Sequence, residues 1–118
     1  MLRAVRGATS VPEDTAEAIR ARTAELLTEV LGRNGLAADD LVSIIFTATQ
    51  DLAAEFPAVA AREIGLSAVP LLCTREIPVV GALPMCIRLL AHCYAPPERE
   101  IRHVYLHEAR QLRTDLPE

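Results

Sequence analysis

Lysine and tryptophan are absent from this 118-residue chain, and aromatic residues make up only 3% of it. Proteins that bind nucleic acids usually present a basic face with aromatic side chains for stacking, whereas this chain has a net charge of −4. We therefore expect no nucleic-acid partner. All twelve basic residues are arginine, which reflects either codon bias or a use of some guanidinium groups to bind carboxylates through two hydrogen bonds.

Long hydrophobic runs are also missing. The first ten residues lack the apolar core of a secretory signal, and Pro78, Pro84 and Arg88 interrupt the longest apolar stretch before it could cross a bilayer. We expect a cytoplasmic protein without a membrane segment.

Cysteines and histidines are few and irregularly spaced: Cys73, Cys86, Cys93, His92, His103 and His107. The odd number of cysteines and the lack of a CxxC spacing argue against a disulfide framework and a zinc site. We also find no Ser-His-Asp or Cys-His order and no glycine-rich phosphate loop. The sequence thus indicates no metal site and no evident nucleophile.

Small apolar residues dominate what is present. Hydrophobic residues make up 51% of the chain, so a core of Ala, Leu, Val and Ile is expected in a single domain over residues 1–118. Such a domain has more apolar surface than it can bury alone. Burial against copies of itself is the usual solution, which favours a homo-oligomer.

The clearest local signal is a helix within "SVPEDTAEAIRARTAELLTEVLGRNG". Asp14 is its predicted N-cap, with Glu17 as the capping-box partner, and Asn34 and Gly35 mark its end. The predicted buried face contains residues at helical spacing: Ile19, Thr23, Leu26, Leu27, Val30 and Leu31.

The other segments predict five strands and a second, short helix. The short helix lies in "FPAVAAREIG", with Pro57 in its first turn and Gly65 after its end. The strands are expected in "LRAVRGAT", in residues 41–47 after a turn at 38–40, twice within residues 69–92, and over at least half of "IRHVYLHEARQL". This pattern predicts an α+β fold with a five-stranded mixed sheet and a polar, loosely ordered tail.

Two charged residues interrupt the apolar stretch "VPLLCTREIPVVGALPMCIRLLAH". Strand alternation puts Arg88 on one face with Cys86, Leu90 and His92. A charge removed from water must be paired or must bind something charged, so Glu76 either pairs with a nearby arginine or faces a ligand. Arg88 has the same two explanations.

Together with Arg6 and Tyr105, these charged side chains predict a pocket for a small anion. The pocket belongs either to a binding protein or to an enzyme whose reaction needs only positioning and electrostatic stabilisation. The residue types alone leave that choice open.

Four stretches in register resemble the monofunctional AroH-class chorismate mutases: "RAVRGATSV", "TATQDLAAEFPAVAAREIG", "VPLLCTREIPVVGALPMCIRLL" and "IRHVYLHEARQLRTDL". The resemblance implies a homotrimer, a pseudo-α/β-barrel of three five-stranded sheets, with active sites between subunits and no cofactor. It implies the Claisen rearrangement of chorismate to prephenate, a step of aromatic amino-acid biosynthesis. This reaction needs no nucleophile and no proton transfer.

The resemblance also implies roles for individual residues. Arg88 would meet the ether oxygen and a carboxylate of chorismate, Arg6 and Tyr105 would bind carboxylates, and Glu76 would face the ring. The predicted substrate-binding residues are Cys73 at the ring hydroxyl, Phe56 and Arg62 at the wall and mouth, and Leu112 closing from the tail. Since Cys73 and Glu76 are three residues apart, the strand must end or bulge near Thr74 for both to reach one ligand.

Three positions differ from residues common in that family: Val59, Leu72 and Thr114. Two rival interpretations remain: a non-catalytic trimeric module that binds small carboxylates, and a trimeric deaminase on a similar barrel. Turnover of chorismate separates them.

Overall fold

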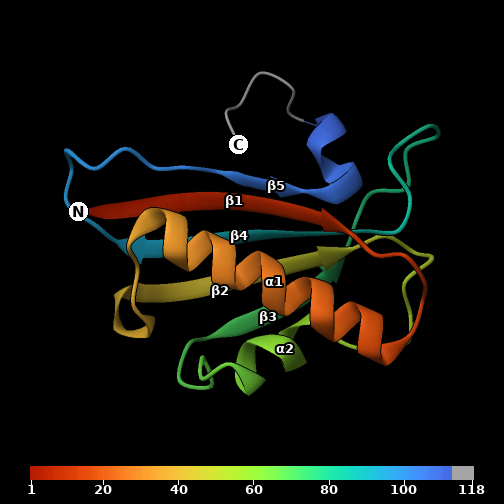
Figure 1. The fold of residues 1–118 in the computed structure, drawn as a ribbon, viewed down its shortest axis with the longest axis horizontal. Coiled ribbons are helices and arrows are strands. Elements are labelled where there is room, and N and C mark those ends of the chain that lie inside the picture. Colours follow the sequence, from red (N-terminus) through yellow and green to blue (C-terminus); the bar gives the residue numbers. More distant parts are fainter. Residues whose placement is uncertain (113–118) are drawn as a thin grey trace.

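Five strands form one mixed sheet in the order β3-β2-β4-β1-β5, in a computed structural model that describes residues 1–112 (Figure 1). β4 pairs antiparallel with β1 and β2, whereas β1–β5 and β2–β3 are parallel. The strands are β1 (Leu2–Ser10), β2 (Leu41–Ala48), β3 (Leu71–Arg75), β4 (Cys86–Tyr94) and β5 (Val104–Leu106). The predicted α+β class and the five strands are confirmed.

The long helix α1 (Ala16–Asn34) begins one residue later than the predicted cap implies. Thr15 is the N-cap, and its hydroxyl accepts a hydrogen bond from the backbone N–H of Ala18 at 3.1 Å. The prediction of Asp14 as N-cap, with Glu17 as its capping-box partner, is therefore wrong. The Asp14 carboxylate instead accepts hydrogen bonds from the N–H groups of Ala53 and Ala54, both at 2.9 Å.

The end of α1 and its buried face agree with the sequence. Gly35 follows the helix with φ 61°, a left-handed conformation that glycine adopts without strain. The predicted apolar face packs on the sheet, with Leu31 half-buried and the others buried. Gly7 on β1 allows this close packing, because a Cβ atom there would lie 3.2–3.3 Å from side-chain atoms of Leu26, Val30 and Leu89.

Thr23 is fully buried on that face, and its hydroxyl has no hydrogen-bond partner among the described residues. Thr23→Val replaces the unpaired hydroxyl with a methyl group, so we expect the free energy of unfolding to rise by about 1 kcal/mol. Urea denaturation measures this free energy. Thr28→Val is the control, because Thr28 is exposed on the same helix. A loss of stability would show that the hydroxyl is hydrogen-bonded in solution.

The short helix α2 spans Pro57–Glu63, as predicted, and a 3₁₀ turn covers Ala38–Asp40 before β2. The C-terminal segment departs from the prediction. Only Val104–Leu106 is strand, and a 3₁₀ helix, η2, covers His107–Leu112, so the expectation that at least half of residues 101–112 is strand is wrong. His107 has φ 54°, which turns the chain away from the sheet. Thr114 and the polar tail lie outside the described residues.

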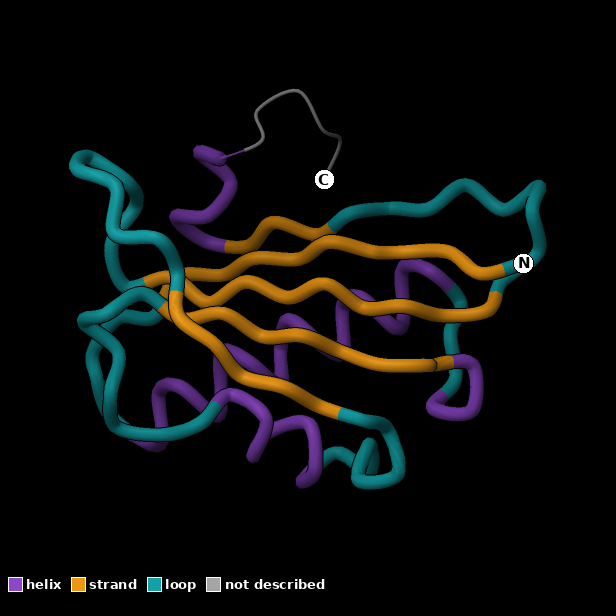
Figure 2. Tube along the Cα trace, turned by 180° about the vertical axis from the view of Figure 1, so that it is seen from behind, coloured by secondary structure: helices purple, strands orange, loops and turns teal. Residues whose placement is uncertain are grey.

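Both α-helices cover the same face of the sheet (Figure 1), and the view from behind shows the strands in front of them (Figure 2). We call the other side the open face. On β4, Ile87, Leu89, Ala91 and Cys93 are buried beneath the helices, whereas Arg88 is exposed on the open face. The predicted alternation along this strand is thus confirmed.

Candidate active site

A cavity of about 410 Å³ lies on the open face and is lined by all four predicted catalytic residues, among others. Its lining comes from all of the strands except β3, together with the segments that follow β3 and β5: Arg6, Gly7, Ile45, Thr47, Glu76, Arg88, Leu89, Leu90, Tyr105 and Leu112. We call it the open-face cavity.

Strand register explains why these side chains meet. Arg88 on the central strand β4 is paired with Thr47 of β2 on one side and with Ala8 of β1 on the other. Ala8 is in turn paired with Tyr105 of β5. Paired residues project to the same face of a sheet, so Thr47, Arg88 and Tyr105 form one row across the open face.

Glu76 and Arg88 form an ion pair within this cavity, with Arg88 Nε 3.4 Å from Glu76 Oε2. The structure thus pairs Glu76 with Arg88 rather than with its neighbour Arg75. The Thr47 hydroxyl donates a hydrogen bond to the same Glu76 oxygen. Because the Arg88 side chain is 45% exposed, the pair contributes little to stability, and its position suits a ligand better than a structural role.

Glu76 reaches the cavity because β3 ends at Arg75. Its backbone N–H then donates to the carbonyl of Ala48 at 3.0 Å, which holds Glu76 beside the end of β2. Arg75 turns away and donates to the carbonyls of Thr49 at 2.8 Å and Leu52 at 2.6 Å.

Arg6 and Tyr105 border the cavity from β1 and β5. The backbone N–H of Arg6 donates to Nδ1 of His103 at 3.0 Å, which joins the segment before β5 to β1. Tyr105 is half-buried and packs, with Leu112, against the buried Ala8, Cys86 and Ala109. Leu112 lies at the end of η2, so this short helix brings it over the cavity.

The remaining predicted site residues do not line the open-face cavity. Cys73 and Phe56 line a second cavity of about 340 Å³, together with the segment that precedes α2. Cys73 is paired with the buried Phe46 and so faces the helices, whereas Glu76 lies past the strand end on the open face. Arg62 is exposed on α2 and lines neither cavity.

Thr47 and Ile45 also line the cavity, although neither was predicted as a site residue. Their alternation with the buried Ile44 and Phe46 was visible in the predicted strand. The signal that would have placed them beside Arg88 is the pairing of β2 with β4, which alternation within one strand does not reveal.

Cys86 is buried in the cluster against which the cavity residues Tyr105 and Leu112 pack. Burial raises the pKa of its thiol, an effect that the nearby Arg88 partly offsets and the Glu76 carboxylate reinforces. The group therefore stays a neutral thiol at pH 7 and is a poor nucleophile. Among residues 1–112, no three His, Cys, Asp or Glu side chains are grouped to hold a metal ion, and no helix is long and apolar enough to cross a membrane.

Comparisons with known proteins give one consistent result. The family model described as "Chorismate mutase type I" matches residues 2–116. The chain is 52% identical over 118 residues to the chorismate mutase AroH of Thermus thermophilus, covering 98% of this chain and 97% of the relative. It is 42% identical over 118 residues to the AroH of Bacillus subtilis (strain 168), covering 98% and 93%. A solved chorismate mutase from Clostridium thermocellum superposes with a TM-score of 0.89 at 47% identity, covering 92% of this chain and 98% of that one.

Proposed function

The chain belongs to the chorismate mutase type I family, and we propose that its open-face cavity is where chorismate rearranges to prephenate. Chorismate mutase activity, an isomerase reaction of aromatic amino-acid biosynthesis, follows from the family match and the two relatives at 52% and 42% identity. No observation favours a non-catalytic carboxylate-binding module. A cytoplasmic location is part of this proposal.

The reaction breaks a C–O bond while a C–C bond forms within one molecule. Chorismate carries two carboxylates, and as the ether bond breaks, negative charge grows on the enolpyruvyl oxygen and positive charge on the ring. The protein must hold the compact conformer and stabilise this charge separation, with no group transferring a proton.

The Glu76–Arg88 pair is the observation that carries the assignment, because it places opposite charges 3.4 Å apart on one wall of the cavity. The Arg88 guanidinium is suited to the ether oxygen and a carboxylate, and Glu76 to the positive charge on the ring. Arg6 and the Tyr105 hydroxyl supply further donors for carboxylates from the neighbouring strands.

The second set of residues, Phe56, Arg62 and Cys73, reaches the substrate from an adjacent subunit of a homotrimer built as a pseudo-α/β-barrel. Two features support this arrangement. The chain itself keeps these residues apart from the open-face cavity. It also leaves apolar side chains uncovered beside that cavity, such as Leu72 at 59% and Ile77 at 79% exposure.

Purified protein should consume chorismate and release prephenate, with a kcat that varies less than about twofold between about pH 6 and 9. The flat profile is expected because the rearrangement transfers no proton. The loss of chorismate absorbance, followed at each pH, measures the consumption of chorismate and its kcat.

Absence of turnover would leave the carboxylate-binding module as the better description. A bell-shaped profile centred near neutral pH would instead point to acid–base chemistry by a histidine.

A further inference from the structure

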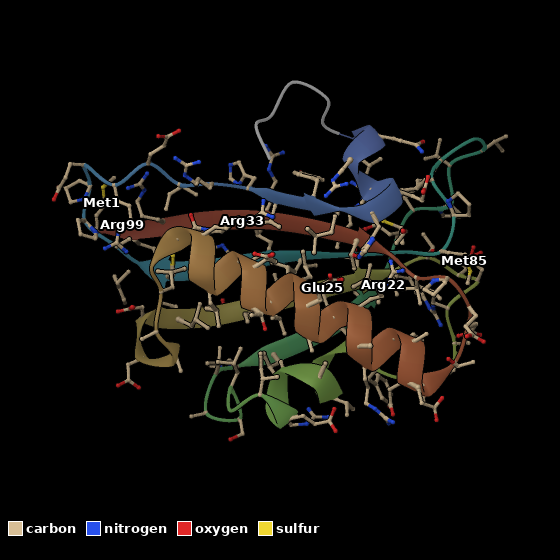
Figure 3. All side chains as sticks on the ribbon, in the orientation of Figure 1. Met1, Arg22, Glu25, Arg33, Met85 and Arg99 are labelled. Atoms are coloured by element: carbon tan, nitrogen blue, oxygen red, sulfur yellow. The ribbon has the colours of Figure 1, made fainter. Side chains whose placement is uncertain are left out.

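Met85 occupies a strained backbone conformation next to the site. Its φ is 51°, in the left-handed region that non-glycine residues rarely adopt. It ends the connection between β3 and β4, directly before Cys86, at the opposite end of the molecule from Met1 (Figure 3). Arg88 is only three residues further on, so the conformation of Met85 determines how β4 enters the sheet. Strain of this kind persists only where surrounding contacts hold it.

Those contacts come mainly from residues 48–52, which comprise the last residue of β2 and the segment that follows it. The N–H of Met85 donates to both carboxylate oxygens of Asp51, at 3.0 and 3.2 Å. The N–H of Cys86 donates to the Thr49 hydroxyl at 3.0 Å, and that hydroxyl donates to Asp51. The backbone N–H of Thr49 donates in turn to the Cys86 carbonyl at 3.0 Å, and that of Val11 to the Met85 carbonyl at 2.8 Å.

The same segment also holds the other end of the connection. Ala48 accepts the N–H of Glu76, and Thr49 and Leu52 accept the guanidinium of Arg75. Residues 48–52 therefore hold both ends of the chain that runs from Glu76 to Cys86. A small shift of this segment would change the distance between the Glu76 carboxylate and the Arg88 guanidinium.

We propose that Asp51 is a positioning residue for the rearrangement, acting through the backbone of Met85 to hold Arg88 beside Glu76. This inference rests on the proposed function of the open-face cavity. Asp51 does not line that cavity; it lines an adjoining hollow, which Glu76 and Arg88 also border. Both of its carboxylate oxygens accept from the single backbone N–H of Met85, and one accepts from the Thr49 hydroxyl. A charged acceptor restrains these donors more strongly than a neutral one would.

Asp51→Ala should lower kcat for chorismate by about 10- to 100-fold, because misplacing a catalytic group by about 1 Å has effects of that order. KM should change less, since Arg6 and Tyr105 keep their places on β1 and β5. Asp51→Asn retains one acceptor oxygen, so its kcat should fall only several-fold. It serves as the second variant if the alanine protein does not fold.

A rescue experiment separates positioning from a general loss of stability. Met85→Gly in the Asp51→Ala background should recover most of the lost kcat, because glycine adopts a φ near 51° without help. Met85→Ala in the same background removes the same side chain but keeps the backbone strain, and should recover nothing. In the unsubstituted protein, Met85→Gly should leave kcat unchanged.

An unchanged kcat in both Asp51 variants, or equal rescue by glycine and alanine, would overturn the positioning role. A lower melting temperature with normal kcat would also overturn it and assign Asp51 to stability alone. If the unsubstituted protein fails to turn over chorismate, the proposed function itself is wrong. Failure of this inference is therefore distinguishable from failure of that function.

Discussion

Arg88→Ala should lower kcat for chorismate by about 10²–10³-fold, equivalent to roughly 3–4 kcal/mol of transition-state stabilisation. The guanidinium comes from the central strand β4 and borders the open-face cavity. In the proposed mechanism, the charge it meets is small in chorismate and grows as the ether bond breaks. Its loss should therefore appear mainly in kcat. The fold should survive, because the Arg88 side chain is 45% exposed and its ion pair with Glu76 is partly solvated.

Arg88→Lys is the sharper test of the same assignment. Lysine keeps the positive charge but lacks the planar group that bridges an ether oxygen and a carboxylate, so we expect most of the loss in kcat to persist. Arg33→Ala is a matched control, since it removes an arginine from the Glu29 ion pair on α1, on the other face of the sheet. That control should keep the unsubstituted kcat.

Chorismate turnover and thermal unfolding of the three variants show whether Arg88 has a catalytic or a structural role. An Arg88→Ala protein that melts at lower temperature yet retains normal kcat would show that Arg88 is only the structural partner of Glu76. Near-normal turnover in Arg88→Lys would show that positive charge suffices and that the geometry of the guanidinium is unimportant.

Two inactive variants should restore activity when assembled together, which tests the intersubunit site directly. One variant carries Arg88→Ala in the open-face cavity, and the other carries Phe56→Ala with Arg62→Ala in the second set. A pocket is intact only where one subunit supplies an unsubstituted open-face cavity and its neighbour supplies an unsubstituted second set. Random assortment in mixed trimers produces this pairing at about one pocket in four, so coexpression should give about a quarter of the unsubstituted turnover.

Light scattering on the mixed protein supplies the control, because a trimer mass is required for the argument. Coexpression of Arg88→Ala with Glu76→Ala should restore nothing, since both changes lie in the same cavity. A trimer in which the first mixture also stays inactive would mean that each subunit builds its site from its own residues.

Much of the local structure was predictable because its causes lie within a few residues. The repeat of apolar side chains identified α1, Gly35 marked its end, and Pro57 marked the start of α2. Alternation placed Arg88 on the side of β4 opposite Leu89. Local reasoning failed at the start of α1. Thr15 caps the helix, whereas the Asp14 carboxylate, the predicted cap, binds backbone N–H groups about 40 residues away.

The sequence by itself thus determined the α+β class, the five strands, and the family and reaction through its motifs. The tertiary structure alone decided which of those residues meet. Pairing of β4 with both β1 and β2 brings Thr47 beside Arg88, and the end of β3 at Arg75 separates Glu76 from Cys73. The physical reason is that strand order and register depend on hydrogen bonds between segments far apart in the chain, whereas alternation within a strand shows only which side chains share a face.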